Sequence, residues 1–344
     1  MLSLLRTVCF YIIYLPKLFF TIRKIHGELK SIFNDSNIPQ KAKSKLNHPK
    51  VKHRVTQYAL IHVVLNESIA QYLGRKLTPS EFTATIHACA SGPFFDDFFD
   101  EYNYSDTEIH QLLQESPIDT FNDIDTNESQ SIASQSGKIA YQYLLNIVYK
   151  NVPDKQRFYT YFHQLYTSQW ESKKLSDIHI PRDEKTVISN NKGGYSALVF
   201  RSLIKDPIPS EESNMLFQLG VVGQFMDDIF DLYDDYHKGL ATLANHFDID
   251  FQPIVSAFYK EIDRLNELIQ QLNIPQNRKR NFQLEINLII AAGQLACDHF
   301  ISVQKSENGE LLLKTIDRKR MIIDMEKWSN QFKMLTTAIS MGIR

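Results

Sequence analysis

Hydrophobic positions recur along most of this chain with the three-to-four-residue period of amphipathic helices. No stretch shows the sustained apolar–polar alternation, bounded by hairpin turns, that is typical of β-strands. Capping boxes beginning at Thr78 and Ser105 predict two helix starts, and Gly239 predicts a helix end. We therefore expect an all-α protein with helices at about 17–34, 51–74, 79–102, 131–150, 154–175, 184–204, 210–238, 250–272, 276–303 and 311–341.

The chain shows no linker, internal repeat or low-complexity tract that would divide it. We expect one helical domain over residues 50–344, preceded by an N-terminal helical segment over 1–49. With 344 residues, of which 43% are hydrophobic, the chain can bury an ample core. The net charge of −2 gives no electrostatic reason to expect nucleic-acid binding. The three cysteines lie far apart, which fits a reducing cytoplasm and argues against a disulfide scaffold.

The N-terminal segment contains a short apolar run from Val8 to Leu15. The run is too short to span a bilayer, and it lacks the small-residue cleavage pattern of a secretory signal. Two interpretations stay open: a helix packed on the surface of the domain, or a segment lying in a membrane interface. The second rests on basic residues among the aromatic ones, namely Arg6, Lys17, Arg23 and Lys24.

Five aspartates interrupt the apolar run that ends at about residue 235. Asp227, Asp231 and Asp235 are spaced i, i+4 and i+8, so on a helix they share one face. Like charges at this spacing destabilise a helix. A divalent cation is the simplest group that would offset the repulsion, because hard cations such as Mg²⁺ take oxygen ligands.

A second acidic cluster lies in the aromatic stretch from Phe94 to Glu101. It contains Asp96, Asp97 and Asp100, with phenylalanines on either side. One such cluster is usually a solvated helix face, but two within apolar helices are hard to explain that way. Buried carboxylates need partners. Two facing sets of them predict a site that holds a metal–diphosphate between them.

These two motifs resemble the aspartate-rich motifs of class I isoprenoid synthases, which include trans-prenyltransferases, class I terpene synthases and the squalene/phytoene synthase branch. The first motif matches the pattern DDxxD. The second, from Gln224 to Asp231, is similar to the prenyltransferase pattern QxxDDxxD, or to the terpene synthase metal triad extended to Asp235. The resemblance covers about residues 50–300, and its motifs are specific only as a pair.

The resemblance implies a single-domain helical bundle of the isoprenoid synthase type around a central apolar cavity. It also implies a cofactor of three Mg²⁺ ions and the ionisation of a prenyl diphosphate to an allylic carbocation. The implied metal ligands are Asp96, Asp97, Asp100, Asp227, Asp231 and Asp235. The implied catalytic residues are Asp96, Asp97, Asp227 and Lys192.

Lys192 precedes a pair of glycines, Gly193 and Gly194, within a predicted helix. Two glycines there suggest a helix break or a close backbone approach, and the segment resembles the lysine-bearing helix of prenyltransferases. Weaker diphosphate-binding candidates are Arg201 and Lys238. A carbocation needs a water-free wall with aromatic faces; the candidate wall residues are Phe95, Phe99, Tyr195, Phe217, Gln224 and Phe225.

The chain departs from elongating prenyltransferases in its basic residues. No arginine follows the first motif until Arg157, and Lys50, Lys52 and Arg54 lack the glycines of the usual N-terminal motif. A second diphosphate would therefore meet few cations, which favours a one-substrate terpene synthase that cyclises or eliminates. The alternatives are a chain-elongating or head-to-head prenyltransferase, and a non-catalytic isoprenoid-binding protein. We expect a cytoplasmic enzyme, with peripheral membrane contact through the N-terminus and a homodimer as open options.

Overall fold

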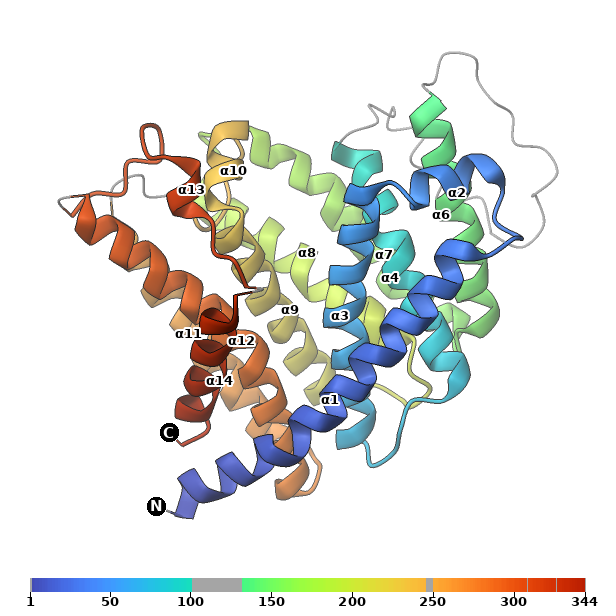
Figure 1. The fold of residues 1–344 in the computed structure, drawn as a ribbon, viewed down its shortest axis with the longest axis horizontal. Coiled ribbons are helices and arrows are strands. Elements are labelled where there is room, and N and C mark those ends of the chain that lie inside the picture. Colours follow the sequence, from blue (N-terminus) through green and yellow to red (C-terminus); the bar gives the residue numbers. More distant parts are fainter. Residues whose placement is uncertain (1, 101–131, 246–249, 308, 326, 344) are drawn as a thin grey trace.

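The computed structural model describes residues 2–100, 132–245, 250–307, 309–325 and 327–343. Helices make up 80% of these residues, and no strand occurs among them, as Figure 1 shows. The helices are α1 (Leu2–Asn34), α2 (Gln40–Leu46), α3 (Pro49–Tyr72), α4 (Pro79–Asp100), α6 (Ile132–Asn151), α7 (Lys155–Glu171), the 3₁₀ turn η1 (Ser172–Ser176), α8 (Arg182–Ser202), α9 (Ser210–Phe230), α10 (Leu232–Lys238), α11 (Gln252–Gln271), α12 (Gln276–Ser306), α13 (Arg318–Met321) and α14 (Trp328–Met341). The prediction of an all-α protein is confirmed.

The helices form one body around two large apolar cores. The first core lies among α1–α4, α6 and α7, and the second lies among α9, α11 and α12. Helices α3 and α8 contribute side chains to both cores, since Val63 and Val199 belong to the first and Ile69 and Leu198 to the second. These two helices therefore join the halves of the molecule, and they lie at its centre in Figure 1.

Local sequence signals set several helix boundaries. The capping box at the start of α4 is confirmed, because Thr78 N donates to Glu81 Oε2 at 2.8 Å and Glu81 N donates to Thr78 Oγ1 at 3.3 Å. Gly239 ends α10 with φ of 72°, a left-handed value that favours glycine. The box beginning at Ser105 and the expected end of the first motif's helix at 102–104 lie outside the described residues.

Four expected boundaries are wrong. The expected helix at 210–238 is divided at Asp231 into α9 and α10. Helix α1 begins at Leu2, not near residue 17, and runs through Pro16, which is exposed. Helix α2 lies between the helices expected at 17–34 and 51–74, where no helix was expected, and its Ala42 and Leu46 are buried against the first core. The expected helix at 311–341 is divided into α13 and α14. Before α13 the chain buries Leu311 and Leu313 in the second core, and that contact replaces a regular helix.

Helices α8 and α9 cross at unusually close range through glycines. A Cβ atom on Gly193 would overlap the carbonyl oxygen of Gly220, and a Cβ on Gly220 would overlap that of Gly193. A Cβ on Gly194 would overlap the ring of Phe217. Helix α8 continues unbroken through this region. Of the two expectations for the glycine pair, the close backbone approach is confirmed and the helix break is wrong.

Replacing Gly220 with Ala is expected to destabilise the protein by about 1–3 kcal/mol, because the two backbones cannot separate without loss of packing. Urea denaturation would measure the change. Gly223 on the same helix is the matched control: a Cβ there meets nothing within 4 Å. Gly223→Ala should gain about 0.5–1 kcal/mol through helix propensity alone. Equal effects of the two substitutions would contradict the close crossing.

Candidate functional site

The first motif lies on the last turns of α4 and is held by two residues of α3. Tyr58 donates its hydroxyl hydrogen to Asp96 Oδ2 at 2.5 Å. Arg54 forms an ion pair with Asp97 and a longer one, 3.4 Å, with Asp96. Asp97 is almost fully buried, so the guanidinium offsets the cost of burying its charge. Gly92 completes the arrangement, because a Cβ there would press on the Tyr58 ring at 3.0 Å.

The second motif spans the junction of α9 and α10. Asp231 lies between the two helices with φ of −91° and ψ of 6°. The helical hydrogen bonds nevertheless continue across it, from Asp231 N to Asp227 O at 2.9 Å and from Asp235 N to Asp231 O at 2.8 Å. The i, i+4, i+8 spacing therefore still places the three carboxylates along one helical face, and they repel one another.

The two motifs come together around Tyr58. Burial raises the pKa of Tyr58 well above its usual value, and the charges of Asp96 and then of Asp227 raise it further. The hydroxyl group of Tyr58 thus bonds a carboxylate of the first motif and is within electrostatic range of one from the second. Lys192 on α8 lies near the second motif, where its charge lowers the pKa values of Asp227, Asp231 and Asp235. Residues from α3, α4, α8, α9 and α10 meet in one polar region.

The second motif carries more negative charge than its surroundings stabilise. The residue Asp227 is solvent-exposed, yet the protein on its other sides limits the solvation of the carboxylate. This partial desolvation, followed by repulsion from Asp231, raises the pKa of Asp227 to about 7. Burial, again followed by the charge of Asp231, raises the pKa of Asp235 to about 7. Burial also raises the pKa of Asp231. A bound cation would stabilise the charged form of carboxylates whose pKa values are raised in this way.

The raised pKa of Asp235 predicts a pH-dependent stability in metal-free buffer. Its folded-state pKa of about 7 exceeds the ordinary value of 3.8, so ionisation costs stability progressively between these values and fully above about pH 7. Asp235→Asn should therefore unfold at a higher temperature than the unmodified protein at about pH 8, and at the same temperature near pH 4. Thermal unfolding monitored by circular dichroism, with a chelator present, would measure the difference.

Asp234 provides a control of opposite sign. Its carboxylate accepts two hydrogen bonds from Arg318, at 2.8 and 2.7 Å. That partner lowers the pKa of Asp234, so its stabilising effect is present above pH 4 and is lost as the pH falls through the lowered value. Asp234→Asn should lower the unfolding temperature slightly at neutral pH. If both variants shifted in the same direction, the assigned environments would be wrong.

Gln224 and the neighbouring Asp228 have a structural part in the second motif. Gln224 Nε2 donates to Asp228 Oδ1 at 2.9 Å and only weakly, at 3.5 Å, to Asp227. The other oxygen of Asp228 accepts from Leu243 N at 3.1 Å, which fastens the segment after α10 to α9. Gln224, expected on a cavity wall, makes its hydrogen bonds within the motif, and its place on such a wall stays a prediction.

The candidate wall aromatics separate into three places. Phe95 and Phe99 contact each other at 5.3 Å between ring centroids, within an aromatic group that α4 shares with α6 and α7. Tyr195 and Phe217 make an edge contact of 5.3 Å at the α8–α9 crossing. Phe225, within the second motif, packs on Phe258 of α11 in the second core. A central apolar cavity between the motifs, which the resemblance implies, is not shown among the described residues.

The two weaker diphosphate candidates have different surroundings. Arg201 has no exposed surface; its Nε donates to Glu212 Oε1 at 2.5 Å, and its other nitrogens donate to backbone carbonyls just beyond α8. The guanidinium is fully occupied in closing the α8–α9 connection, so the structure does not bring Arg201 to the aspartates. Lys238 is exposed at the end of α10, where its charge acts on Asp231 and Asp235.

The oxygen-rich donor set fits Mg²⁺ when the substrate supplies further ligands. Among the described residues, no three His, Cys, Asp or Glu side chains are grouped closely enough to hold an ion alone. Mg²⁺ typically takes one or two carboxylates, water and substrate phosphates, and such sites do not need a complete protein cage. The side chain of Asp100, the remaining expected ligand, lies outside the described residues.

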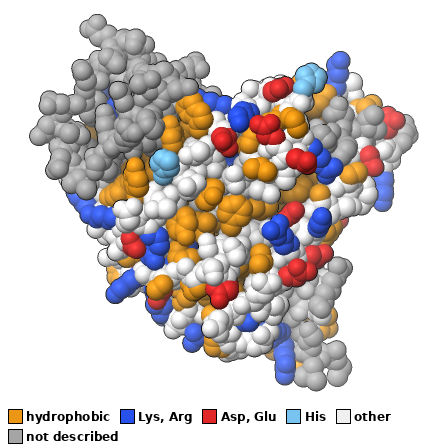
Figure 2. All heavy atoms as spheres, turned by 180° about the vertical axis from the view of Figure 1, so that it is seen from behind, with side chains coloured by type: hydrophobic (Ala, Val, Ile, Leu, Met, Phe, Trp, Pro, Cys, Tyr) orange, Lys and Arg blue, Asp and Glu red, His pale blue; other side chains and the backbone are white. Residues whose placement is uncertain are grey.

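Three residues at the site were not chosen from the sequence. Tyr58 and Arg54 lie one helical turn apart on α3 and hold the first motif, while Lys185 is buried near Asp228. An i, i+4 pair of Arg and Tyr in a largely apolar helix was the available signal. On the face seen in Figure 2, acidic and basic side chains are mixed along the upper part above an apolar band, and no broad basic area is visible among the described residues.

No protein-family model matches this chain, and a search of curated proteins finds no match. The family to which the two motifs point therefore stays a prediction from those motifs.

Proposed function

We propose that this protein is a Mg²⁺-dependent class I terpene synthase that ionises a single prenyl diphosphate. The observation that carries the proposal is that Tyr58 bonds Asp96 of the first motif while the charge of Asp227, from the second motif, also raises the pKa of Tyr58. The two motifs are therefore electrostatically linked through one side chain of α3. Excess carboxylate charge in the second motif, with Lys192 beside it, suits a site that takes cations together with an anion.

In this proposal Asp96 and Asp97 would hold metal from one side, and Asp227, Asp231 and Asp235 from the other. The bound metal would neutralise the diphosphate and so make it a better leaving group. Lys192 would add a positive charge on the side of α8. The C–O bond to the prenyl group then breaks, its electron pair leaves with the diphosphate, and the allylic cation cyclises or loses a proton.

The basic residues favour one substrate over two. The only arginine bound to the first motif, among the described residues, is Arg54, and the motif's own carboxylates engage it. Residues 101–131, which follow the motif, contain no Lys or Arg in the sequence. A second diphosphate, as in chain elongation, would find little compensating charge there.

Product analysis tests the proposal. The purified protein with Mg²⁺ would receive all-trans prenyl diphosphates of increasing length, each with and without isopentenyl diphosphate. The expected result is a hydrocarbon or an alcohol from one prenyl diphosphate alone. Longer diphosphates formed only with isopentenyl diphosphate would make the protein a chain-elongating prenyltransferase instead. Binding of diphosphate without turnover would favour an isoprenoid-binding protein.

A further inference from the structure

Helix α1 has one face buried in the protein and a second, apolar face in contact with solvent. On the buried face, Tyr11 donates its hydroxyl hydrogen to Leu284 O of α12 at 2.7 Å, and Thr7 donates to Gly342 O beyond α14 at 3.1 Å. These contacts fix the helix along the body of the protein. On the opposite face, large hydrophobic side chains recur at helical spacing: Leu5, Ile12, Ile13, Phe19 and Phe20.

The exposed face is too extensive for an ordinary soluble surface. Ile12 is 66% exposed and Phe20 is 67% exposed. Helix α1 is long and apolar enough to cross a bilayer by composition, and so is α12, but α12 is largely buried inside the protein and α1 is not. Thr7 is bound to the residue just after α14, and Tyr11 is bound to α12. Because these contacts hold α1 against the protein, α1 is suited to lie on a membrane with its outer face immersed.

Helix α14, which packs beside α1, also exposes large apolar side chains. It packs on α1 and α12 through a small apolar cluster that includes Tyr11 and Ala338, and it lies beside the first turns of α1 in Figure 1. Its exposed side carries Trp328, which is 86% exposed, and Phe332 one turn later. Aromatic side chains of this kind, Trp above all, are favoured at the level of lipid headgroups.

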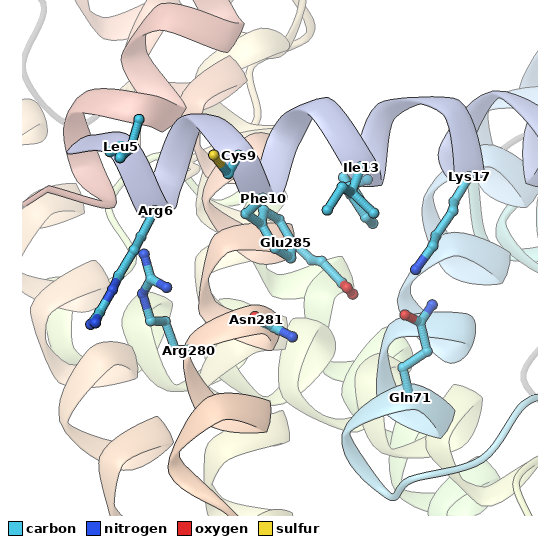
Figure 3. Close-up of a pocket in the computed structure, with 11 residues that line it drawn as sticks. Leu5, Arg6, Cys9, Phe10, Ile13, Lys17, Gln71, Arg280, Asn281 and Glu285 are labelled. Atoms are coloured by element: carbon cyan, nitrogen blue, oxygen red, sulfur yellow. The ribbon is translucent and has the colours of Figure 1, made fainter. Parts of the chain in front are cut away.

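A cavity of about 520 Å³ opens beside this surface, between α1, α3 and α12. Figure 3 shows Arg6 and Arg280 at one end of it and Lys17 at the other, with the carboxylate of Glu285 between them. No ion pair joins the three cations to a carboxylate within the described part of the chain. Ile13 lines the same cavity, so the cavity continues into the exposed apolar face.

Glu285 is the second, independent feature of the cavity. The residue is only 4% exposed; Ser68 hydrogen-bonds its carboxyl group, but the Oε2 atom has no hydrogen-bond partner. A buried carboxylate oxygen without a partner is costly, and a ligand that donates a hydrogen bond would remove that cost. A ligand that fits the cavity would have three parts. An anionic group would lie near the arginines, a hydrogen-bond donor would reach Glu285, and an apolar part would extend along α1.

We propose that the outer face of α1, with Trp328 and Phe332, docks on a phospholipid bilayer, and that the cavity binds a phospholipid headgroup bearing a phosphate and a hydrogen-bond donor. Phosphate suits the guanidinium groups of Arg6 and Arg280. An ammonium or hydroxyl group beyond the phosphate would reach Glu285. The acyl chains would then lie against Ile13 and Phe20. This inference is independent of the proposed catalytic function, because none of its residues belongs to the aspartate motifs.

Vesicle flotation with the full-length protein tests the proposal. The vesicles would be phosphatidylcholine alone, phosphatidylcholine with phosphatidylethanolamine, and phosphatidylcholine with phosphatidylglycerol. We expect binding to all three and the strongest binding to the two mixtures, because the quaternary ammonium of phosphatidylcholine has no hydrogen to donate to Glu285. Equal binding to the three compositions, at any strength, would overturn the headgroup assignment.

Substitutions separate the two parts of the surface. Ile12→Glu should lower binding to every vesicle at least about tenfold, because it places a charge in the immersed face. Ile178→Glu is the matched control, because Ile178 is 68% exposed but is not part of α1 or α14. This variant should bind vesicles as the unmodified protein does. Arg280→Gln and Glu285→Gln should reduce the preference for the mixed vesicles while phosphatidylcholine binding persists. If Glu285→Gln does not fold, Arg280→Gln still tests the headgroup assignment.

Three results would overturn the proposal. The first is unchanged vesicle binding by Ile12→Glu. The second is a dimer, detected by light scattering, that Ile12→Glu dissociates while no vesicle is bound, which would make a second copy of the chain the occupant. The third is thermal stabilisation by soluble glycerophosphoethanolamine without vesicle binding, which would make the cavity a site for a soluble ligand.

Discussion

Replacing Asp227 with Asn is expected to lower kcat/KM for prenyl diphosphate turnover by about 10²–10³-fold, because one of the groups that would hold cation charge at the diphosphate is lost. The same substitution should leave the fold intact. Because Asp227 is solvent-exposed, water screens much of its repulsion from Asp231, so the variant should resist heat at about pH 8 without metal at least as well as the unmodified protein. Activity assays and thermal unfolding on the same preparations would measure both.

Asp234→Asn is the matched control for activity. Asp234 lies on α10 beside the second motif, but its carboxylate binds Arg318. Turnover by this variant should stay within a few-fold of the unmodified protein, on the scale of surface ion pairs. If Asp227→Asn retained full activity, or if both variants lost it equally, the assignment of metal ligands to one face of α9 and α10 would be wrong.

Replacing Arg201 with Met is expected to destabilise the protein by about 3–5 kcal/mol, because it leaves Glu212 buried without its cation. Neither side chain has appreciable exposed surface, and Glu212 also accepts a hydrogen bond from Tyr72. The hydrogen bonds that Arg201 donates to the backbone carbonyl oxygens of Ile204 and Pro207 would be lost as well. Urea denaturation of the purified variant would measure the loss.

Two further variants distinguish a buried pair from a general packing defect. Arg201→Met combined with Glu212→Gln should be less destabilised than Arg201→Met alone, because no unpaired charge remains. Arg318→Met, which breaks the exposed pair with Asp234, should cost at most about 1 kcal/mol. Similar losses for Arg201→Met and Arg318→Met would contradict the structural part assigned to Arg201.

Much of the fold follows from local sequence signals. The capping box at Thr78 and the left-handed Gly239 are properties of a few neighbouring residues, so their positions are correct. The errors arise where distant packing decides the outcome. Pro16 lies within α1 because Tyr11 and Ile25 on either side of it are both buried on the inner face. The region before α13 is irregular because Leu311 and Leu313 enter the second core.

The candidate site was predictable only in part, for a related reason. The spacing of Asp227, Asp231 and Asp235 is a helical property, and the position of Lys192 beside them agrees with the sequence interpretation. Tyr58 comes from a separate helix; its spacing from Arg54 marks a polar face of α3, but only the tertiary packing shows that this face reaches Asp96. Arg201 was expected at the diphosphate because it shares α8 with Lys192, but its side chain bonds Glu212 instead.

The glycines at the α8–α9 crossing connect the fold with the site. Gly193 follows Lys192 directly, and its contact with Gly220 sets how close α8 lies to α9. Asp227 lies two turns beyond Gly220 on the same helix. The distance between the lysine and the second motif therefore depends on the absence of side chains at this crossing, which gives Gly193 a part in the site besides its part in packing.

The most direct test of the central claim is a calorimetric titration with inorganic diphosphate in the presence and absence of Mg²⁺. The claim is that both acidic motifs act as one site. Diphosphate should bind only when Mg²⁺ is present. Asp97→Asn and Asp227→Asn should each weaken binding by at least about tenfold. The loss of binding free energy in the double variant should be much smaller than the sum of the two single losses. Metal-independent binding, or binding that only one motif affects, would contradict it.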